Sequence, residues 1–273
     1  MTRALSLASA VASGTVVVAV AVVALVGLAG GCAQPNGLAM GALLDAHRPS
    51  SSQEAVHSVC PAATTIAGID VSDYQATIDW SAVAADGNQF AFIRVSDGLG
   101  FPDSEYDNNW PGARAAGVVR GTYQFFRSDE DPIAQADLLL SKMGALEAGD
   151  LPPVADVEST DGVDNATRAA NLHAWLDHVE AAVGVKPIIY TGGYFWQDNV
   201  GADFSEYPLW HAGYTGGTCP STIADQWPGW AFWQFTDSKA VNGIPAGGVD
   251  GDEFNGTLDQ LQGSLTVTPV CGD

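Results

Sequence analysis

Basic residues are scarce in this chain. Its 273 residues include 10 Lys and Arg against 32 Asp and Glu, which gives a formal net charge of −22 at pH 7. Nucleic-acid phosphates are bound by Lys and Arg, so this balance argues against a nucleic-acid partner. It also argues against electrostatic docking on an anionic membrane. We attribute the acidity to solubility.

Cysteine is scarce as well. The chain has four, and no His and Cys residues are clustered at the spacing of metal ligands. The acidic string of Asp250, Asp252 and Glu253 lacks the complete spacing of a calcium-binding loop. The sequence therefore predicts no metal and no other cofactor.

Only one long apolar run is present, and it lies near the N-terminus. A short head with Arg3 precedes apolar residues 15–28, and small residues follow before Cys32. This layout is typical of a secretory signal peptide at residues 1–31. The ending Leu-Ala-Gly-Gly-Cys resembles the bacterial lipobox, in which the cysteine is lipidated, although Leu28 lies one position further from Cys32 than usual. We favour a membrane-anchored lipoprotein. Ordinary cleaved secretion and an uncleaved anchor stay open, and all three put the remainder outside the cytoplasm.

Residues 32–64 have the composition of a flexible tether, with little periodic apolar pattern. We therefore expect the globular domain to span residues 65–273. With Cys32 set aside, an oxidising compartment favours one disulfide among Cys60, Cys219 and Cys271. A Cys60–Cys271 bridge would tie the ends of the domain together, and a Cys60–Cys219 bridge is the alternative that stays open.

Short apolar runs alternate with longer mixed segments from Ile66 onward. The predicted strands are residues 66–71, 90–95, 119–125, 153–157, 187–190, 208–212, 230–235 and a short one near 248–250. The predicted helices are residues 79–85, 109–116, 132–146 and 166–183. This alternation indicates an α/β fold with parallel strands joined by crossovers, and about eight strands suggest a closed, single-domain β/α barrel. The helical signal fades past Tyr207, so we expect loops between the last strands.

Two carboxylates close the apolar stretch at residues 151–158. Asp156 and Glu158 are two positions apart, so in an extended strand they point the same way, roughly 6.6 Å apart along the chain. Each would then affect the proton affinity of the other. Further acids and aromatic or amide side chains recur at the predicted strand ends: Asp70, Tyr123, Gln124, Tyr190, Trp210, Trp233 and Asp250. Barrel enzymes build their active sites at the C-terminal ends of strands, and acids ringed by aromatic side chains suit a sugar ligand.

A series of short motifs occurs in order between Ile66 and Leu261. They are Gly-Ile-Asp-Val-Ser (68–72), Ile-Asp-Trp (78–80), Phe-Ala-Phe-Ile-Arg-Val (90–95), Arg-Gly-Thr-Tyr-Gln-Phe-Phe (120–126), Asp-Val-Glu (156–158), Ile-Ile-Tyr-Thr (188–191), Phe-Trp-Gln-Phe (232–235) and Gly-Val-Asp-Gly-Asp-Glu-Phe (248–254). In this order and at these spacings they resemble glycoside hydrolase family 25, the Chalaropsis-type lysozymes. Two positions depart from the family pattern. Gln124 stands where a histidine is usual, and Ser-Asp-Gly at 96–98 replaces Thr-Glu-Gly.

The resemblance implies an exported muramidase that hydrolyses the β-1,4 bond between N-acetylmuramic acid and N-acetylglucosamine in peptidoglycan. It also implies a flattened barrel with eight strands and about five helices. Glu158 matches the proton donor, Asp156 its partner, and Asp70 and Asp250 two further acids. Neighbouring carboxylates would keep Glu158 protonated, while we expect Asp156 to stay ionised and orient the acetamido group of the substrate, with net retention. A carboxylate nucleophile and an activated water stay open as alternatives for the second step.

Substrate contacts are expected from Tyr123, Tyr190, Trp210, Trp233 and Gln124, although aromatic side chains in a barrel are equally typical of its core. The expected partner is the glycan strand of peptidoglycan. We expect a monomer that touches a membrane only through a lipid anchor at Cys32. Two rival functions stay open, a catalytically inactive wall-binding protein on the same fold and a hydrolase of chitin-like polymers.

Overall fold

The computed structural model describes residues 56–245 and 247–265 of the chain. The predicted signal peptide, Cys32 with its predicted lipid, most of the predicted tether and Cys271 lie outside the described residues. Within the described part, no helix combines the length and apolar character that crossing a bilayer requires.

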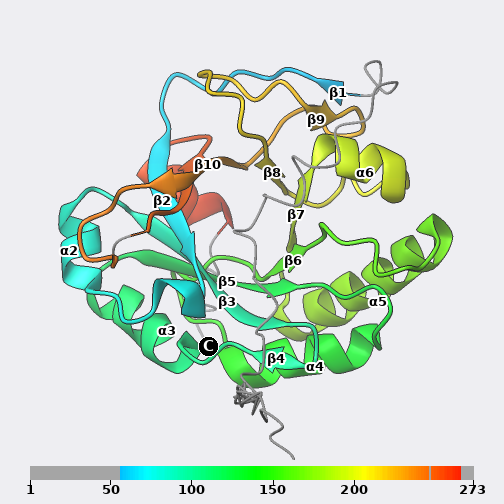
Figure 1. Cartoon of the computed structure of the whole chain (residues 1–273), viewed down its shortest axis with the longest axis horizontal. Coiled ribbons are helices and arrows are strands. Elements are labelled where there is room, and N and C mark those ends of the chain that lie inside the picture. The colour runs from blue at the N-terminus through cyan, green and yellow to red at the C-terminus, as the bar shows by residue number, and fades with distance from the viewer. Residues whose placement is uncertain (1–55, 246, 266–273) are drawn as a thin grey trace, which may run out of the picture. The chain divides into compact units, whose positions relative to one another are not determined.

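Eight strands close into a barrel (Figure 1). In the order of hydrogen-bonded neighbours they are β2 (Ile66–Val71), β3 (Phe90–Asp97), β5 (Val119–Phe125), β6 (Val154–Asp156), β7 (Ile188–Gly192), β8 (Leu209–Ala212), β10 (Phe232–Lys239) and β11 (Val249–Phe254), which pairs with β2. A short strand, β4 (Phe101–Pro102), adds to β3. The predicted α/β barrel of about eight strands is confirmed.

The direction of β11 differs from the parallel arrangement that we predicted. β11 runs antiparallel to both β10 and β2, whereas the other neighbouring strands of the barrel are parallel. Residues 240–248 between β10 and β11 are too few for a parallel crossover, which needs a dozen residues or more. The beginning of β11 therefore lies beside the C-terminal end of β2.

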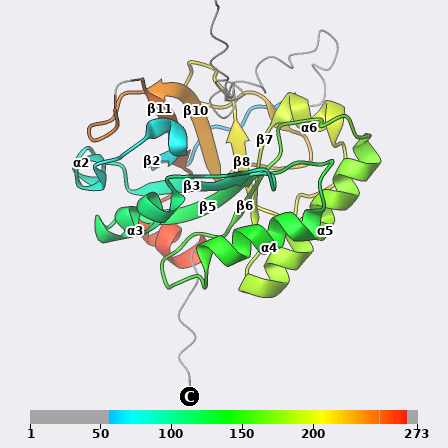
Figure 2. The ribbon, with the colours of Figure 1, turned by 60° about the horizontal axis from the view of Figure 1, so that its bottom comes forward.

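Helices cover part of the outside of the barrel. They are α2 (Trp80–Ala85), α3 (Tyr106–Ala115), α4 (Pro132–Met143), α5 (Asn165–Val183) and α6 (Gly193–Asn199), with short helical turns at η1 (Asp73–Gln75), α7 (Leu258–Gln260) and η2 (Leu261–Leu265). Figure 2 shows α3, α4 and α5 along the wall formed by β3, β5 and β6. Between β8 and β11 the described chain contains no helix, as the fading helical signal predicted.

The helix starts follow directly from the sequence. Asp79 accepts hydrogen bonds from the backbone of Ser81 and Ala82 at the start of α2, and Asp131 caps α4 in the same way ahead of Pro132. Aspartate at this position satisfies N–H groups that have no partner within the helix, and proline at the first helical position lacks that N–H. These capping residues fix where the crossover helices begin.

Residues 56–60 are attached to the barrel domain. β1 (Val56–His57) pairs with β9 (Ile223–Ala224), Trp230 Nε1 donates to Val59 O over 2.8 Å, and Cys60 forms a disulfide with Cys219. Residues 56–60 fall within the predicted tether, and these contacts join them to the barrel. The disulfide resolves the open choice of partners in favour of Cys219.

Aromatic rings fill the barrel interior. Phe92 stacks on Trp210 with ring centroids 4.3 Å apart, and Phe232 meets Phe90 and Phe92 edge-on. A Cβ atom at Gly68 would come within 2.4 Å of the Phe90 ring, so only glycine fits on β2 at this point. Stacked and edge-on contacts add to the stabilisation from apolar burial. The rings thus hold β2, β3, β8 and β10 around one core.

Candidate active site

Asp156 and Glu158 lie at the C-terminal end of β6. Asp156 is the last residue of the strand, and Glu158 follows two positions later. The neighbouring strands fix the backbone here, because Phe126 N–H donates to Asp156 O over 2.8 Å and Val157 N–H donates to Tyr190 O over 2.9 Å. Both carboxyl groups are therefore held on a rigid part of the barrel.

Asp70 and Asp250 approach from the opposite side of the barrel. Asp70 is the fifth residue of β2 and lies directly opposite Asp250, the second residue of β11. Asp250 therefore begins its strand, whereas the sequence analysis grouped it with residues at strand C-termini. The antiparallel course of β11 nevertheless brings it to the same end of the barrel.

The four acids form one buried group, which we call the acidic site (Asp70, Asp156, Glu158 and Asp250). Their exposed fractions are 1%, 0%, 3% and 5%. The carboxyl groups act on one another electrostatically, since Glu158 and Asp70 raise the pKa of Asp156, and Asp70 and Glu158 raise that of Asp250. The structure thus brings together all four acids that the sequence predicted.

Burial dominates the titration of the acidic site. It raises the pKa of Asp156 well above its ordinary value, with the charge of Glu158 as the next cause. Both carboxyl oxygens of Asp156 are buried without a hydrogen-bond partner among the described residues. Burial likewise raises the pKa of Asp250 to about 11. In the free protein these effects favour a protonated Asp156, which runs against our expectation that Asp156 stays ionised.

Asp70 differs because it receives a hydrogen bond. Burial raises its pKa to about 7, and the hydrogen bond from Gln234 opposes that rise. Gln234 Nε2 donates to Asp70 Oδ2 over 2.7 Å, while Gln234 Oε1 accepts from Tyr190 OH over 2.8 Å and from Tyr214 OH over 2.6 Å. With both phenol groups donating to its oxygen, the amide directs its N–H groups to Asp70.

The aromatic side chains predicted to bind substrate are almost fully buried. Trp210 Nε1 donates to Asp252 over 2.8 Å, Trp233 Nε1 donates to Gly213 O over 2.8 Å, and Tyr123 meets the Trp210 ring edge-on. Tyr190 is engaged with Gln234. Packing and positioning are the roles that these contacts show, and contact with a sugar stays a prediction.

Gln234 and Asp252 are site residues that the sequence analysis did not select. Asp252 is fully buried, two residues after Asp250 and therefore on the same face of β11. The alternation of side chains along a strand is the signal that could have identified Asp252. For Gln234 the sequence offers its position near the end of the predicted strand 230–235 and its place in the Phe-Trp-Gln-Phe motif.

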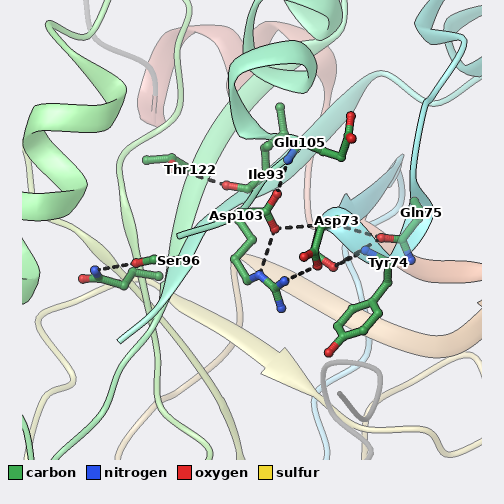
Figure 3. Close-up of polar contacts among 11 residues, drawn as sticks. Asp73, Tyr74, Gln75, Ile93, Ser96, Asp103, Glu105 and Thr122 are labelled. Carbon is green, nitrogen blue, oxygen red and sulfur yellow. Dashed lines mark hydrogen bonds and ion pairs between the residues drawn. The ribbon is translucent and has the colours of Figure 1, made fainter. Parts of the chain in front are cut away.

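A second polar group braces the loops after β2 and β3 (Figure 3). Arg94 forms ion pairs with Asp73 and Asp103. Asp103 also accepts hydrogen bonds from the backbone of Asp73 and Glu105, each over 2.9 Å. The positive charge of Arg94 partly offsets the rise that burial causes in the pKa of Asp70. The contacts around Arg94 therefore also affect the acidic site.

The sequence profile of the glycosyl hydrolases family 25 matches residues 69–244 of the chain. The chain belongs to glycosyl hydrolase family 25. The predicted family and enzyme class, a glycoside hydrolase of the lysozyme type, are confirmed.

Several relatives are similar over most of the chain. YegX of Escherichia coli K12 is 38% identical over 207 residues, which cover 74% of each protein. Lysozyme M1 of Streptomyces globisporus is 30% identical over 217 residues, or 75% of this chain and 73% of that protein. The solved structure of a family GH25 lysozyme from Aspergillus fumigatus matches with a TM-score of 0.68 at 29% identity, covering 75% of this chain and 100% of that chain.

The two departures from the family 25 pattern have structural roles here. Gln124 Nε2 donates to Ser96 Oγ over 2.9 Å, and Gln124 Oε1 accepts from Trp175 Nε1 over 2.8 Å, so this amide links β5 to β3 and α5. Asp97 forms an ion pair with Arg127, which also binds Asp161.

Among the described residues, no group of three or more His, Cys, Asp or Glu is arranged to hold a metal ion.

Proposed function

We propose that this protein is an exported muramidase that hydrolyses the β-1,4 bond between N-acetylmuramic acid and N-acetylglucosamine in peptidoglycan. The observation that carries the proposal is the acidic site, where Asp156 and Glu158 meet Asp70 and Asp250 at one end of the barrel. Membership of family 25 and the similarity to Lysozyme M1 support the substrate.

In this proposal Glu158 donates the proton to the leaving oxygen. A carboxyl group with this task must keep its proton near neutral pH, and burial disfavours its ionisation. Glu158 is buried and interacts electrostatically with Asp156 and Asp250. As the bond breaks, positive charge develops at the anomeric carbon. Asp70 is the acid best placed to be anionic, because it accepts a hydrogen bond from Gln234.

For the second step we propose assistance by the substrate itself. Asp156 would bind the acetamido group, whose oxygen attacks the anomeric carbon as the leaving group departs and closes a second ring on the sugar. Water then attacks the anomeric carbon and opens this new ring, which gives net retention. The two buried oxygens of Asp156 without a protein partner support a ligand contact at this carboxyl group. NMR of the first-formed sugar tests this step. A β anomer is expected, and an initial α anomer would exclude retention.

Among the five predicted substrate contacts, we propose that Tyr123 and Trp233 are the ones closest to the sugar. Within the described part of the chain, Tyr123 and Trp233 have no hydrogen bond to another side chain, whereas Tyr190, Trp210 and Gln124 each have at least one. The latter three would act by holding other site residues in place, through the hydrogen bonds described above.

Export is supported by the cysteines as well as by the N-terminal sequence. The Cys60–Cys219 bridge fits an oxidising compartment outside the cytoplasm. We propose that residues 1–31 direct export and that Cys32 carries the lipid anchor. Mass spectrometry of the mature N-terminus tests this: a lipidated Cys32 is expected, and a mature chain that begins elsewhere without lipid would contradict it.

Clearing of a peptidoglycan suspension tests the activity. The wild type is expected to lower turbidity, and Glu158→Gln to lose at least a hundredfold in rate, as expected when a general acid is removed. Glu206→Gln changes an exposed glutamate in the same way and should leave the rate unchanged. Wild-type binding without clearing would favour an inactive wall-binding protein. Faster cleavage of chitooligosaccharides than of peptidoglycan would favour the chitin-like substrate.

A further inference from the structure

Asp252 is a fifth carboxyl group that the roles proposed above leave unexplained. It lies on β11 directly opposite Gln234 of β10 and has no exposed surface. A buried ionised carboxylate is costly unless it is paired with a cation and hydrogen-bonded. Among the neighbouring charges, the one that raises the pKa of Asp252 most, after burial, is that of another acid, Asp70.

Asp70 and Asp252 each have one oxygen with a protein donor. Gln234 Nε2 donates to Asp70 Oδ2 over 2.7 Å, and Trp210 Nε1 donates to Asp252 Oδ1 over 2.8 Å. The remaining oxygens, Asp70 Oδ1 and Asp252 Oδ2, are buried and receive no other donor from the described residues. The two carboxyl groups are diagonal neighbours across the β2–β11 pair, because Asp70 lies opposite Asp250 and Asp252 follows two residues later on the same face of β11, opposite Gly68, which has no side chain. A hydrogen bond between two carboxyl groups requires that one of them carries a proton.

The surroundings do not compensate two negative charges. Asp250 interacts electrostatically with Asp70 and Asp252. The other titratable and charged groups that interact with one or more of these three acids are Arg94, Tyr123, Asp156, Glu158, Tyr190, Tyr214, Asp237 and Lys239. Of the two cations, Arg94 is already paired with Asp73 and Asp103. Lys239 Nζ donates to Gly68 O and Asn88 Oδ1. Burial accordingly raises the pKa of Asp252 well above its ordinary value.

We propose that Asp252 is a positioning residue that shares one proton with Asp70 and holds Asp70 in place for the acidic site. Asp252 carries the proton and donates to Asp70 Oδ1, while Trp210 fixes its other oxygen. When Asp70 is ionised, it then has a donor on each oxygen. The role of Asp70 toward a substrate rests on the proposed function, whereas the shared proton does not depend on it.

The shared proton is tested by unfolding, without any activity measurement. Asp252 would be protonated in the folded protein but ionised in the unfolded chain above about pH 4, so unfolding would release a proton. One such proton makes the unfolding equilibrium constant rise about tenfold per pH unit. Asp252→Asn removes the carboxyl group that releases this proton. The asparagine side chain can still accept a hydrogen bond from Trp210 through its carbonyl and donate one to Asp70 through its amide.

Denaturant unfolding at pH 5, 6 and 7 is therefore compared for three proteins. The logarithm of the unfolding constant should rise with pH less steeply in D252N than in the wild type, by about one per pH unit. Glu253→Gln, one residue further along β11 and on its other face, should keep the wild-type slope. An unchanged slope in D252N would overturn the proposal. So would failure of D252N to fold, because a permanent analogue of the protonated side chain should fit.

Activity distinguishes positioning from a purely structural role. On peptidoglycan, D252N should keep kcat within about threefold of the wild type, since Asp70 retains a donor. Asp252→Leu removes that donor and should lose at least tenfold in kcat with little change in KM, in protein that is still folded. Equal activity of the folded D252N and D252L would refute positioning. If the wild type itself does not hydrolyse peptidoglycan, the proposed function fails, and the unfolding slopes still decide on the shared proton.

Discussion

The amide of Gln234 and the carboxylate of Asp70 are joined by a hydrogen bond of 2.7 Å between residues 164 positions apart in the chain. The amide cannot rotate freely, because Tyr190 and Tyr214 both donate to its oxygen. Asp70 therefore always meets a donor, which favours its ionised form at a buried position.

Gln234→Glu should replace the amide donor by another carboxyl group against Asp70 and raise the pKa of Asp70 above its value of about 7. If catalysis requires ionised Asp70, the pH at which activity rises should be higher in Q234E than in the wild type. We expect kcat/KM at pH 7 to fall at least tenfold, about 1.4 kcal/mol. Tyr214→Phe leaves the Tyr190 donor in place and should have a smaller effect. A pH–rate profile of Q234E that coincides with the wild type would show that this contact does not matter.

His211 should make the protein less stable in acid. It is fully buried, and burial lowers its pKa to about 3 from an ordinary 6.5. Between these values the unfolded chain binds a proton that the folded protein does not, so this contribution to stability is complete above about pH 6.5 and is lost as pH falls.

Replacing His211 should reduce the loss in the free energy of unfolding as the pH falls below about 6.5. In His211→Gln the loss between pH 6 and pH 4 should be smaller by about 1.4 kcal/mol per pH unit than in the wild type. His178→Gln, at a half-exposed histidine paired with Asp137, serves as the control. Denaturant titrations at these pH values provide the measurement. Parallel curves for H211Q and the wild type would contradict the role of His211.

The Cys60–Cys219 bridge should contribute substantially to stability. It joins positions 159 residues apart, and a cross-link over so long a loop restricts the unfolded chain strongly. The double variant C60S/C219S should lose about 2–5 kcal/mol and unfold at a lower Tm. Reductant should lower the Tm of the wild type to a similar extent and leave that of the double variant unchanged. Equal Tm values for wild type and double variant would contradict this prediction.

Moderate salt should raise the activity on cell walls. The chain carries a formal net charge of −22, so an anionic wall repels it at long range. Screening shortens the reach of that repulsion from about 30 Å at 0.01 M salt to about 10 Å at 0.1 M. Rates of clearing across this range provide the measurement, with a short uncharged glycan as the salt-insensitive control. A steep fall in rate over the same range would contradict the prediction.

Much of the fold could be predicted from local patterns. The apolar runs gave β2 and β5 their observed limits, and Asp79, Asp131 and Gly184 mark helix ends through their capping chemistry. The pairing of Asp156 with Glu158 follows from the two-residue repeat of a strand. These features depend on neighbours in sequence, which is why composition and spacing identify them.

The remaining features depend on which strands become neighbours in space. The contacts of Gln234 with Asp70 and of Trp210 with Asp252 join β10 to β2 and β8 to β11, and no local pattern encodes them. For the same reason the sequence left the partner of Cys60 open. The antiparallel course of β11 arises from the connection at residues 240–248, which is shorter than the crossovers between the earlier, parallel strands.

The most direct test of the account is the chemical identity of the products. Peptidoglycan digested by the wild type is reduced and analysed by mass spectrometry, beside a digest with Glu158→Gln. A muramidase leaves N-acetylmuramic acid at the new reducing ends, so we expect reduced muramic acid in the wild-type digest and almost none with E158Q. New reducing ends on N-acetylglucosamine, or equal product from E158Q, would contradict the account.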